Sequence, residues 1–419
     1  MNKFFILATA ALIALASCAK MDLESTPDIL VTFQAANYVP QTKAGEVPVS
    51  VFNDFTSFRC RGFMHAEGVD LNSDGSVITT GTGKPSYQEF FGANGETISP
   101  YNSSDVIISN PTPDSDAVHY WAPSHNYYWP KSSVSYVNFA AWYGTDGTDA
   151  VDPTVNYAYT GSPAKWTATM TWDYANSTVG ESRANFLYAD MAWRFKENPG
   201  AGYKFNGLTS DYKGVPMLFH HALAQINVKA YAFSSSLGLT AGTDEITEAL
   251  SGGATCTRVI TLEDLEITSV HRAGTLTLTN ADPGGDSATT QAWTGGWSGT
   301  DTVGDLTTAD KIVDQVSQAT AEDVFAATCV IPQAIGTDVL LNFNLHIVTT
   351  YDNNGDTVVH EEIIPQSLKL GEGGFGITEW QQNHKYTYFL KIVPAEGAVR
   401  FDPALDAVWV TTNTEPKEV

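Results

Sequence analysis

Cysteine and basic residues are both scarce in this sequence, and each shortage excludes a class of protein. Only 4 of the 419 residues are cysteine, too few for a small scaffold that is held together by disulfides. Lysine and arginine number 22 against 47 acidic residues, which gives a formal net charge of −25. Such a surface repels phosphate backbones and anionic headgroups, so we expect no nucleic-acid partner.

Long apolar runs are also missing after the first residues. The one long run, Phe4 to Leu15, follows a positively charged start at Met1-Asn2-Lys3. It has the length of the apolar part of a signal peptide and is too short to span a bilayer. No later run approaches the length of a transmembrane helix, so the sequence predicts an exported chain.

A cysteine directly follows this apolar run. Leu15-Ala16-Ser17-Cys18 looks like a bacterial lipobox, in which the thiol takes up a diacylglycerol. We therefore expect a signal peptide at 1–17, cleavage between Ser17 and Cys18, lipidation of Cys18, and a polar tether at 18–28. Several acyl chains on one terminus anchor a protein firmly. The alternative is an ordinary secretory signal with a chance cysteine.

The rest of the chain has the composition of an extracellular β protein. Aromatic residues make up 11% and charged residues 16% of it, with 34 glycines and 19 prolines. Leu341, Phe343, Leu345 and Ile347 alternate with polar residues, the period of a half-buried strand, and a second alternation runs through 385–393. Asn353-Asn354-Gly355 predicts a hairpin turn. Short strands with turn signals between them favour β-sandwiches.

Helices are expected to be few and short. The two candidates are "GTDEITEALSG" at 242–252 and "TAEDVFAATC" at 320–329. A polar, glycine-containing break at 196–214 suggests two domains, 29–205 and 206–419. Cys60, Cys256 and Cys329 remain after Cys18; their number is odd, and we expect them to pack as small hydrophobic residues, with one disulfide as the alternative.

None of the motifs that suggest chemistry has the context that its chemistry needs. "GEGGFG" at 371–376 precedes an expected strand, whereas a nucleotide loop precedes a helix. Asp70 begins a segment that matches the start of a calcium loop, but its twelfth position is Gly81 instead of glutamate. His220 and His221 are adjacent in an expected strand and would point to opposite faces. We therefore predict no catalytic residue, no metal site and no cofactor, and a protein that is not an enzyme.

Four segments together resemble the fimbrillin-like family of Bacteroidetes, the subunits of type V pili. They are "YYWPKSSVSYVNFAAWYG" at 127–144, "VPMLFHHALAQINVKAYA" at 215–232, "CVIPQ" at 329–333 and the closing segment "WQQNHKYTYFLKIVPAEGAVRFDPALDAVWV" at 380–410. The resemblance implies two tandem transthyretin-like Greek-key β-sandwiches. It also implies a lipoprotein precursor at the outer membrane that becomes part of a surface-exposed fimbrium.

The resemblance further implies proteolysis after a basic residue that follows the first strand. "ILVTFQAANYV" at 29–39 is an apolar strand, and Lys43 follows it, so the expected cut lies between Lys43 and Ala44; Arg59 and Arg61 are alternatives inside an expected buried strand. Losing the first strand would open a groove that a donor strand of another subunit fills. The donor candidate is "LDAVWVTTNT" at 405–414, where Leu405, Ala407 and Trp409 share one face. The alternative is that this segment stays in its own domain.

The expected partners are other pilus subunits, the outer membrane through the lipid, and host or bacterial surface ligands. The competing interpretation is a surface lipoprotein that binds glycans. Trp293 and Trp297 lie four residues apart in "QAWTGGWSGT", and exposed tryptophans could stack on sugar rings, although packing against the end of a sandwich is an equal alternative.

Overall fold

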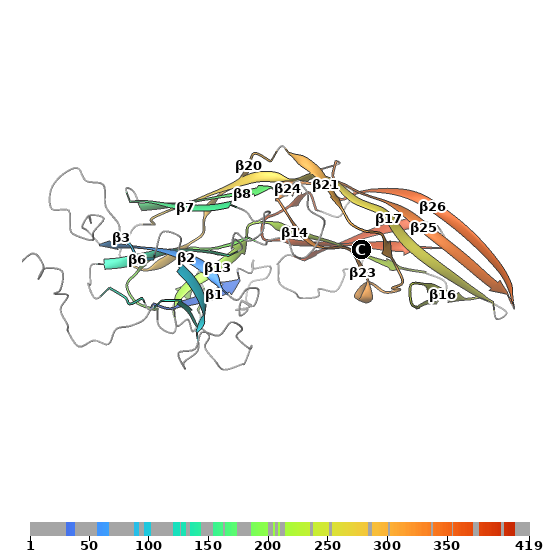
Figure 1. The fold of residues 1–419 in the computed structure, drawn as a ribbon, viewed down its shortest axis with the longest axis horizontal. Coiled ribbons are helices and arrows are strands. Elements are labelled where there is room, and N and C mark those ends of the chain that lie inside the picture. Colours follow the sequence, from blue (N-terminus) through green and yellow to red (C-terminus); the bar gives the residue numbers. More distant parts are fainter. Residues whose placement is uncertain are drawn as a thin grey trace, which may run out of the picture.

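The chain is all-β in its computed structural model (Figure 1), which confirms the expected fold class. The structure describes residues 31–37, 57–66, 88–91, 96–101, 120–125, 127–130, 135–143, 154–161, 164–173, 186–199, 204–205, 208–209, 214–234, 238–250, 254–283, 287–300, 302–336, 338–353, 355–371, 377–394 and 398–406. Within these residues the helical content is one 3-10 turn, η2, at Gln318–Thr320.

Ten strands form the N-terminal sheet, in the order β19-β10-β6-β9-β13-β1-β5-β4-β2-β3. They are β1 Phe33–Asn37, β2 Phe58–Ala66, β3 Gln88–Glu89, β4 Glu96–Tyr101, β5 Tyr120–Pro123, β6 Ser135–Tyr143, β9 Leu187–Ala189, β10 Met191–Phe195, β13 Val215–His221 and β19 Thr289–Gln291. β6 also pairs with β2, and this pairing closes the strands β6-β9-β13-β1-β5-β4-β2 into a ring. An aromatic-rich core that includes Phe33, Phe58, Phe139 and Phe219 belongs to this sheet.

A second sheet covers one side of this ring. It has the order β20-β18-β8-β7, with β7 Thr154–Gly161, β8 Ala164–Asp173, β18 Ala273–Ala281 and β20 Thr294–Ser298. Trp166 and Met170 of β8 and Leu278 of β18 pack with Phe63 of β2 and Trp193 of β10 in one buried cluster. In Figure 1 these strands lie above β2, β6 and β13.

The C-terminal half is a sandwich of two larger sheets. The first has the order β23-β14-β28-β29, with β14 Ala224–Ala232, β23 Glu322–Val330, β28 Lys385–Val393 and β29 Ala398–Asp406. The second contains β15 Leu239–Ala241, β16 Ile246–Ala249, β17 Thr255–His271, β21 Val303–Thr307, β22 Lys311–Ile312, β25 Leu340–Asn353 and β26 Asp356–Lys369. Two small pairs complete the described strands: β11 Lys204–Phe205 with β12 Leu208–Thr209, and β24 Gln333–Ala334 with β27 Glu379–Trp380.

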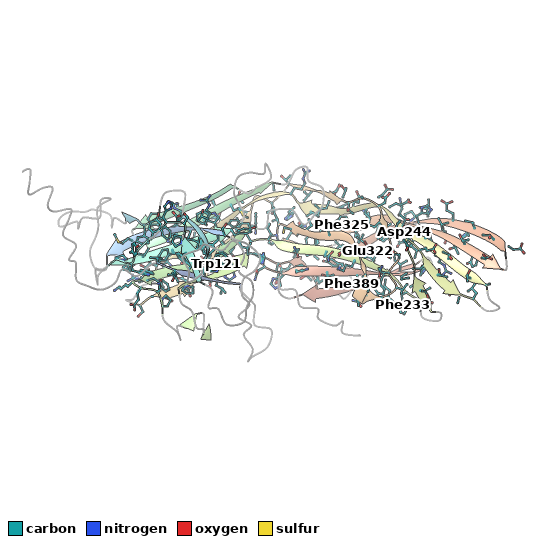
Figure 2. All side chains as sticks on the ribbon, turned by 60° about the horizontal axis from the view of Figure 1, so that its bottom comes forward. Trp121, Phe233, Asp244, Glu322, Phe325 and Phe389 are labelled. Carbon is teal, nitrogen blue, oxygen red and sulfur yellow. The ribbon has the colours of Figure 1, made fainter. Side chains whose placement is uncertain are left out.

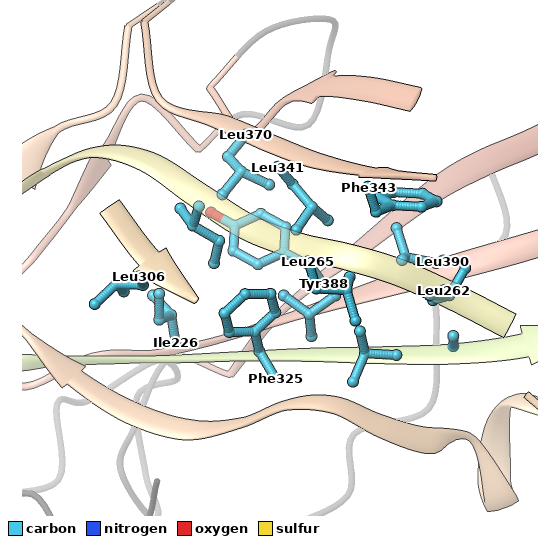
Figure 3. Close-up of a cluster of buried hydrophobic side chains, with 14 of the residues drawn as sticks. Ile226, Leu262, Leu265, Leu306, Phe325, Leu341, Phe343, Leu370, Tyr388 and Leu390 are labelled. Carbon is cyan, nitrogen blue, oxygen red and sulfur yellow. The ribbon is translucent and has the colours of Figure 1, made fainter. Parts of the chain in front are cut away.

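The core of this sandwich uses the alternation expected from the sequence. Leu341 and Leu345 of β25 are fully buried and pack with Ile226 of β14 and Tyr388 of β28 in one cluster. Figure 3 shows Leu341, Ile226 and Tyr388 in this cluster. The expected hairpin is also confirmed, because β25 pairs with β26 from Leu340↔Lys369 to Asn353↔Asp356. The labelled residues of Figure 2 show the two halves end to end in an elongated molecule, with Trp121 in one and Phe325 in the other.

Both helix candidates are wrong, because each of these segments contains a strand. Residues 322–330 form β23, which pairs with β14 across two register shifts. The irregular pairing buries the neighbours Val324 and Phe325 together, a spacing that resembles a helix in the sequence. Residues 246–249 form β16, in which Glu248 is buried and forms an ion pair with Arg258.

The chain crosses between its two halves more than once. β13 lies beyond residue 206, yet it pairs with β1 and β9 of the N-terminal sheet. β18 and β19 later return to pair with β8 and β10, and the small β11–β12 pair spans residues 204–209. A division into domains 29–205 and 206–419 stays a prediction.

Candidate functional site

The first strand is inserted between two others, and its place is the candidate functional site. β1 runs parallel to β13 from Phe33↔Val215 to Asn37↔Phe219. On its other side it pairs antiparallel with β5 at Phe33↔Trp121. A strand with partners on both sides is an interior strand of the sheet, although it lies so near the start of the described chain.

Phe33 inserts from β1 into the aromatic core. Its side chain is fully buried. Its ring lies edge-on to Phe139 at 5.2 Å between ring centroids and to Phe58 at 6.2 Å, and it is tilted against Phe91 at 6.2 Å. Burying a phenylalanine stabilises a fold by about 1.5–3 kcal/mol, and edge-on aromatic pairs add to this. β1 therefore contributes directly to the stability of the N-terminal half.

Hydrogen bonds hold Val31 and Thr32, the two residues directly before β1. The N–H of Val31 donates to the carbonyl oxygen of Tyr127 at 2.9 Å, and the carbonyl oxygen of Thr32 accepts from the N–H of Val215 at 2.8 Å. The N–H of Thr32 donates to Oδ1 of Asn198 at 3.0 Å. Gly214 fits this close approach, since a Cβ there would lie 2.8 Å from the backbone of Phe33. The neighbouring residues thus form hydrogen bonds at the start of β1 and leave space for its backbone.

A buried carboxylate braces the segment beside β1. Glu96 accepts hydrogen bonds from the Ser124 hydroxyl, from Nδ1 of His125 at 3.1 Å and from the Tyr127 hydroxyl at 3.2 Å. Burial opposes ionisation of the Glu96 carboxyl, but these hydrogen bonds outweigh it and lower its pKa. Tyr127 is the residue whose carbonyl oxygen receives the N–H of Val31. The carboxylate therefore supports the place of β1.

Glu96, Ser124 and His125 were not singled out by the sequence, and their residue types are those of a catalytic triad. Their geometry differs from one. Nδ1 of His125 lies 3.2 Å from the Ser124 hydroxyl and 3.1 Å from Oε1 of Glu96, so both partners compete for the same nitrogen. A triad needs the hydroxyl on one ring nitrogen and the carboxylate on the other. The arrangement is suited to bracing and not to activating the serine.

The adjacent histidines lie in β13, as expected. Nε2 of His220 lies 2.7 Å from Oδ1 of Asp190, and its ring stacks on Tyr188. His221 is buried, which lowers its pKa to about 3 with a further effect of the charge on His220. Among the described residues no group of three or more histidine, cysteine and acidic side chains could hold a metal ion.

Trp293 and Trp297 pack against the protein. The indole N–H of Trp293 donates to the carbonyl oxygen of Ala189 at 2.7 Å, and that of Trp297 to the carbonyl oxygen of Ala222 at 3.1 Å. Both rings are half-buried against the cluster that contains Trp193. Of the two interpretations that the sequence left open, packing is therefore the one that the structure supports.

The three cysteines Cys60, Cys256 and Cys329 are free and buried, which confirms that they pack as small hydrophobic residues. Arg59 and Arg61 lie within β2, the expected strand, but Arg59 is exposed and Arg61 is half-buried, so the strand is not buried along its whole length. Leu405 lies in β29, paired with Tyr386 of β28. The other predicted site residues lie outside the described residues: Ser17, Cys18, Lys43, Ala44, Asp70, Ala407 and Trp409. In the part of the chain that the structure describes, no helix is long and apolar enough to cross a membrane.

Comparisons with known proteins give structural neighbours only. No protein-family model matches the chain, and no curated protein matches its sequence. A fimbrial protein from Bacteroides vulgatus is similar, with 14% identity and a TM-score of 0.44 over 90% of this chain and 99% of that one. A proposed cell adhesion protein from Bacteroides uniformis has 14% identity and a TM-score of 0.35, over 90% of this chain and 97% of that one. Another from Bacteroides ovatus has 11% identity and a TM-score of 0.37, over 93% and 100%.

Proposed function

We propose that this chain is a structural subunit of a cell-surface pilus. In this proposal it is exported as a lipoprotein, activated by proteolysis and assembled by donor-strand exchange, and the resulting fimbrium supports adhesion. The observation that carries the proposal is the position of β1, an interior strand near the start of the described chain. The sequence motifs that resemble fimbrillin-like proteins support the same function.

Removing β1 would leave a vacancy that another strand can fill. β13 would lose five paired residues on one side, from Val215 to Phe219, and β5 would lose its partner at Trp121. The aromatic rings around Phe33 would lose a fully buried neighbour. Unpaired strand edges and exposed apolar surface favour pairing with an extended segment of another chain.

Lys43 is the proposed cleavage residue because it follows β1 in the sequence and precedes β2. A cut between Lys43 and Ala44 would separate β1, with the lipid on Cys18, from the rest of the chain. Arg59 is a poorer site, since it pairs with Thr97 of β4 and Trp142 of β6, and proteases prefer exposed segments without such pairing. Other pilus subunits are the proposed partners, and the outer membrane is the proposed site of the precursor.

Limited proteolysis tests this function. Trypsin treatment of the purified chain should release the N-terminal segment and yield a ladder of high-mass polymers. Lys43→Ala should prevent both effects, whereas the matched variant Arg59→Ala should behave like the unmodified chain. A synthetic peptide of residues 29–39 added after cleavage should occupy the vacancy and stop polymer growth. A monomer that merely loses its N-terminus would contradict the proposal.

The competing function is glycan binding by a surface lipoprotein, and its two candidate residues, Trp293 and Trp297, are packed against the protein. The indole N–H groups of Trp293 and Trp297 are bound to backbone carbonyl oxygens, and sugar binding would have to use the remaining exposed parts of their rings. Replacing either tryptophan should change stability and leave any glycan affinity unaltered, which an array of surface polysaccharides would check.

A further inference from the structure

The outer edge of β26 is a long exposed strand edge. β26 ends the strand order β15-β16-β17-β25-β26, and among the described residues its strand partner is β25 alone. All residues from Asp356 to Ile363 are exposed, and the exposed fractions of Val358, Val359 and Ile363 are 62%, 61% and 55%. In Figure 1 the hairpin of β25 and β26 forms the end of the elongated molecule. Such an edge is a template for pairing with another chain.

Proline marks which backbone groups of β26 face outward. Pro365 lies opposite Asn344 of β25, and it has no N–H to donate. Proline in a sheet occupies edge positions where its missing N–H would face away from the neighbouring strand. Since the direction of these groups alternates along a strand, the outward N–H and C=O groups belong to Val359, Glu361 and Ile363.

The residue order around Glu361 is symmetric in its chemistry. It reads Val358-Val359-His360-Glu361-Glu362-Ile363-Ile364, with two apolar residues at each end and a polar residue on each side of the centre. An antiparallel pair of two such strands, centred on Glu361, would place Val359 opposite Ile363 and Val358 opposite Ile364. It would place His360 of each copy opposite Glu362 of the other. This gives two pairs of opposite charge, one on each side of Glu361.

We propose that β26 pairs with β26 of a second copy of this chain, antiparallel about Glu361. The outward N–H and C=O groups of Val359, Glu361 and Ile363 would then form hydrogen bonds with the same groups of the other copy. The contact is isologous, so it closes after two copies and does not propagate. It uses the β25–β26 hairpin and leaves β1 untouched, so it is independent of the proposed strand exchange and would join subunits side by side.

The two copies of Glu361 at the centre are the unfavourable contact of this arrangement. Like charges directly opposite each other destabilise a strand pair. In each copy, however, Oε1 of Glu361 lies 3.0 Å from Nε2 of His346, whose Nδ1 lies 2.6 Å from Oε1 of Glu263. Each carboxylate therefore has an imidazole partner within its own chain. Removing the charge with Glu361→Gln should tighten the pairing.

Disulfide trapping tests the register. In a full-length Cys18→Ala background the native cysteines Cys60, Cys256 and Cys329 are buried, so an added cysteine is the exposed thiol. Glu361→Cys should give a covalent dimer on mild oxidation, because the two positions lie opposite each other. Thr357→Cys is the matched control: it is also exposed and on the same face, but its counterpart lies roughly 27 Å away, at about 3.4 Å per residue.

A charge exchange tests the same register without oxidation. Sedimentation velocity should show a reversible, concentration-dependent dimer of the Cys18→Ala chain. The dissociation constant of this parent is compared with those of the charge variants near pH 6, where an imidazole carries positive charge. His360→Glu places two carboxylates opposite each other at both pairs and should weaken the dimer about fivefold or more. The double variant His360→Glu with Glu362→His restores opposite charges and should return the constant to about that of the parent.

Three results would overturn the proposal. The first is a monomer at all concentrations together with equal cross-linking of both cysteine variants. The second is a dimer that His360→Glu leaves unchanged, which would place the contact elsewhere. The third is open-ended aggregation in place of a closed dimer. Since none of these experiments cleaves the chain, their failure would leave the strand-exchange proposal intact.

Discussion

The indole N–H of Trp297 donates a hydrogen bond to the carbonyl oxygen of Ala222, with 3.1 Å between nitrogen and oxygen. Ala222 and Leu223 are the fully buried residues that separate β13 of the N-terminal sheet from β14 of the C-terminal sandwich. Asn383 holds the same junction, since its side chain accepts from the N–H of His221 and its own N–H donates to the carbonyl oxygen of Leu223, each at 3.0 Å. The junction is thus hydrogen-bonded to two distant parts of the chain.

Trp297→Ala should destabilise the protein by about 3 kcal/mol, because it removes half-buried ring packing and leaves the Ala222 carbonyl without this donor. Trp297→Phe keeps most of the ring and should cost about 1 kcal/mol. Urea unfolding monitored by circular dichroism measures both, with the exposed Tyr128→Ala as a control that should change little. Equal effects of the two Trp297 variants would show that the lost hydrogen bond, and not ring packing, accounts for the destabilisation.

Phe33→Ala should destabilise the N-terminal half by about 3–5 kcal/mol, the cost of truncating a buried phenylalanine. The buried cluster that contains Leu341 and Tyr388 does not include Phe33, so the C-terminal sandwich should keep its protection. Hydrogen exchange read by mass spectrometry would show faster exchange in β13 and β5 and unchanged exchange in β25. Uniformly faster exchange would mean that the two halves unfold together.

His221 should make the protein less stable in acid. Burial lowers its folded pKa to about 3, below the unfolded value of about 6.5. The unfolded chain therefore binds a proton that the folded chain excludes between these values, and stability falls by about 1.4 kcal/mol per pH unit as the pH drops through that window. His221→Gln should flatten this part of the pH profile in urea unfolding, whereas the exposed His360→Gln should preserve it.

His346 should make the protein less stable as the pH rises, the opposite of the effect of His221. A hydrogen bond with Glu263, followed by the charges of Glu263 and Glu361, raises its pKa despite some burial. Its contribution is fully present below the unfolded value of about 6.5 and is lost as the pH rises through the folded value. The two histidines thus have opposite effects on how stability depends on pH, and urea unfolding of His221→Gln and of His346→Gln measures each effect separately.

The sequence predicts local features of this fold well and long-range pairing poorly. The strict alternation at Leu341 to Ile347 and the turn at Gly355 identified the β25–β26 hairpin, since both signals are local. The sequence of β23 predicts a helix wrongly, because the irregular pairing of this strand with β14 buries Val324 beside Phe325. Nothing near Leu276 indicates that β18 returns to pair with β8, from Ala273↔Asp173 to Ala281↔Lys165.

The candidate site shows the same division. The apolar segment that contains Phe33 was recognised as a strand, but its parallel pairing with β13 joins residues far apart in the sequence. Glu96 is not predictable from the sequence, because its partners Ser124, His125 and Tyr127 lie in another segment and no spacing rule links them. The tryptophans were visible in the sequence, yet only the structure reveals the carbonyl oxygens that their N–H groups contact.

Cys18→Ala should block lipidation and surface delivery. Cys18 follows the apolar run and the small residues that a lipobox requires, and only a thiol can form the thioether to diacylglycerol. Membrane fractionation of cells labelled with an acyl-chain precursor measures this. Labelled Cys18→Ala protein in the membrane fraction, indistinguishable from the parent, would contradict the lipobox interpretation.

A pair of C-terminal truncations separates the two roles left open for the last segment. β29 ends at Asp406 and pairs along its whole length with β28, from Val393↔Ala398 to Lys385↔Asp406. Truncation after Asp406 keeps this strand and removes Ala407 and Trp409 from the chain. If residues 405–414 donate a strand, this variant should have unchanged urea stability and should fail to extend a polymer after proteolysis.

Truncation after Ala404 is the companion variant, because it also removes Leu405 and Asp406 from their pairing with Tyr386 and Lys385. Losing two residues from the end of an edge strand should lower stability slightly without unfolding the sandwich, whose core is centred on Tyr388, Leu341 and their neighbours. If the segment is only part of its own sandwich, both variants should still polymerise, in proportion to the folded protein that remains. Normal polymers from the protease-treated Asp406 truncation would therefore rule out a donor role for Ala407 and Trp409.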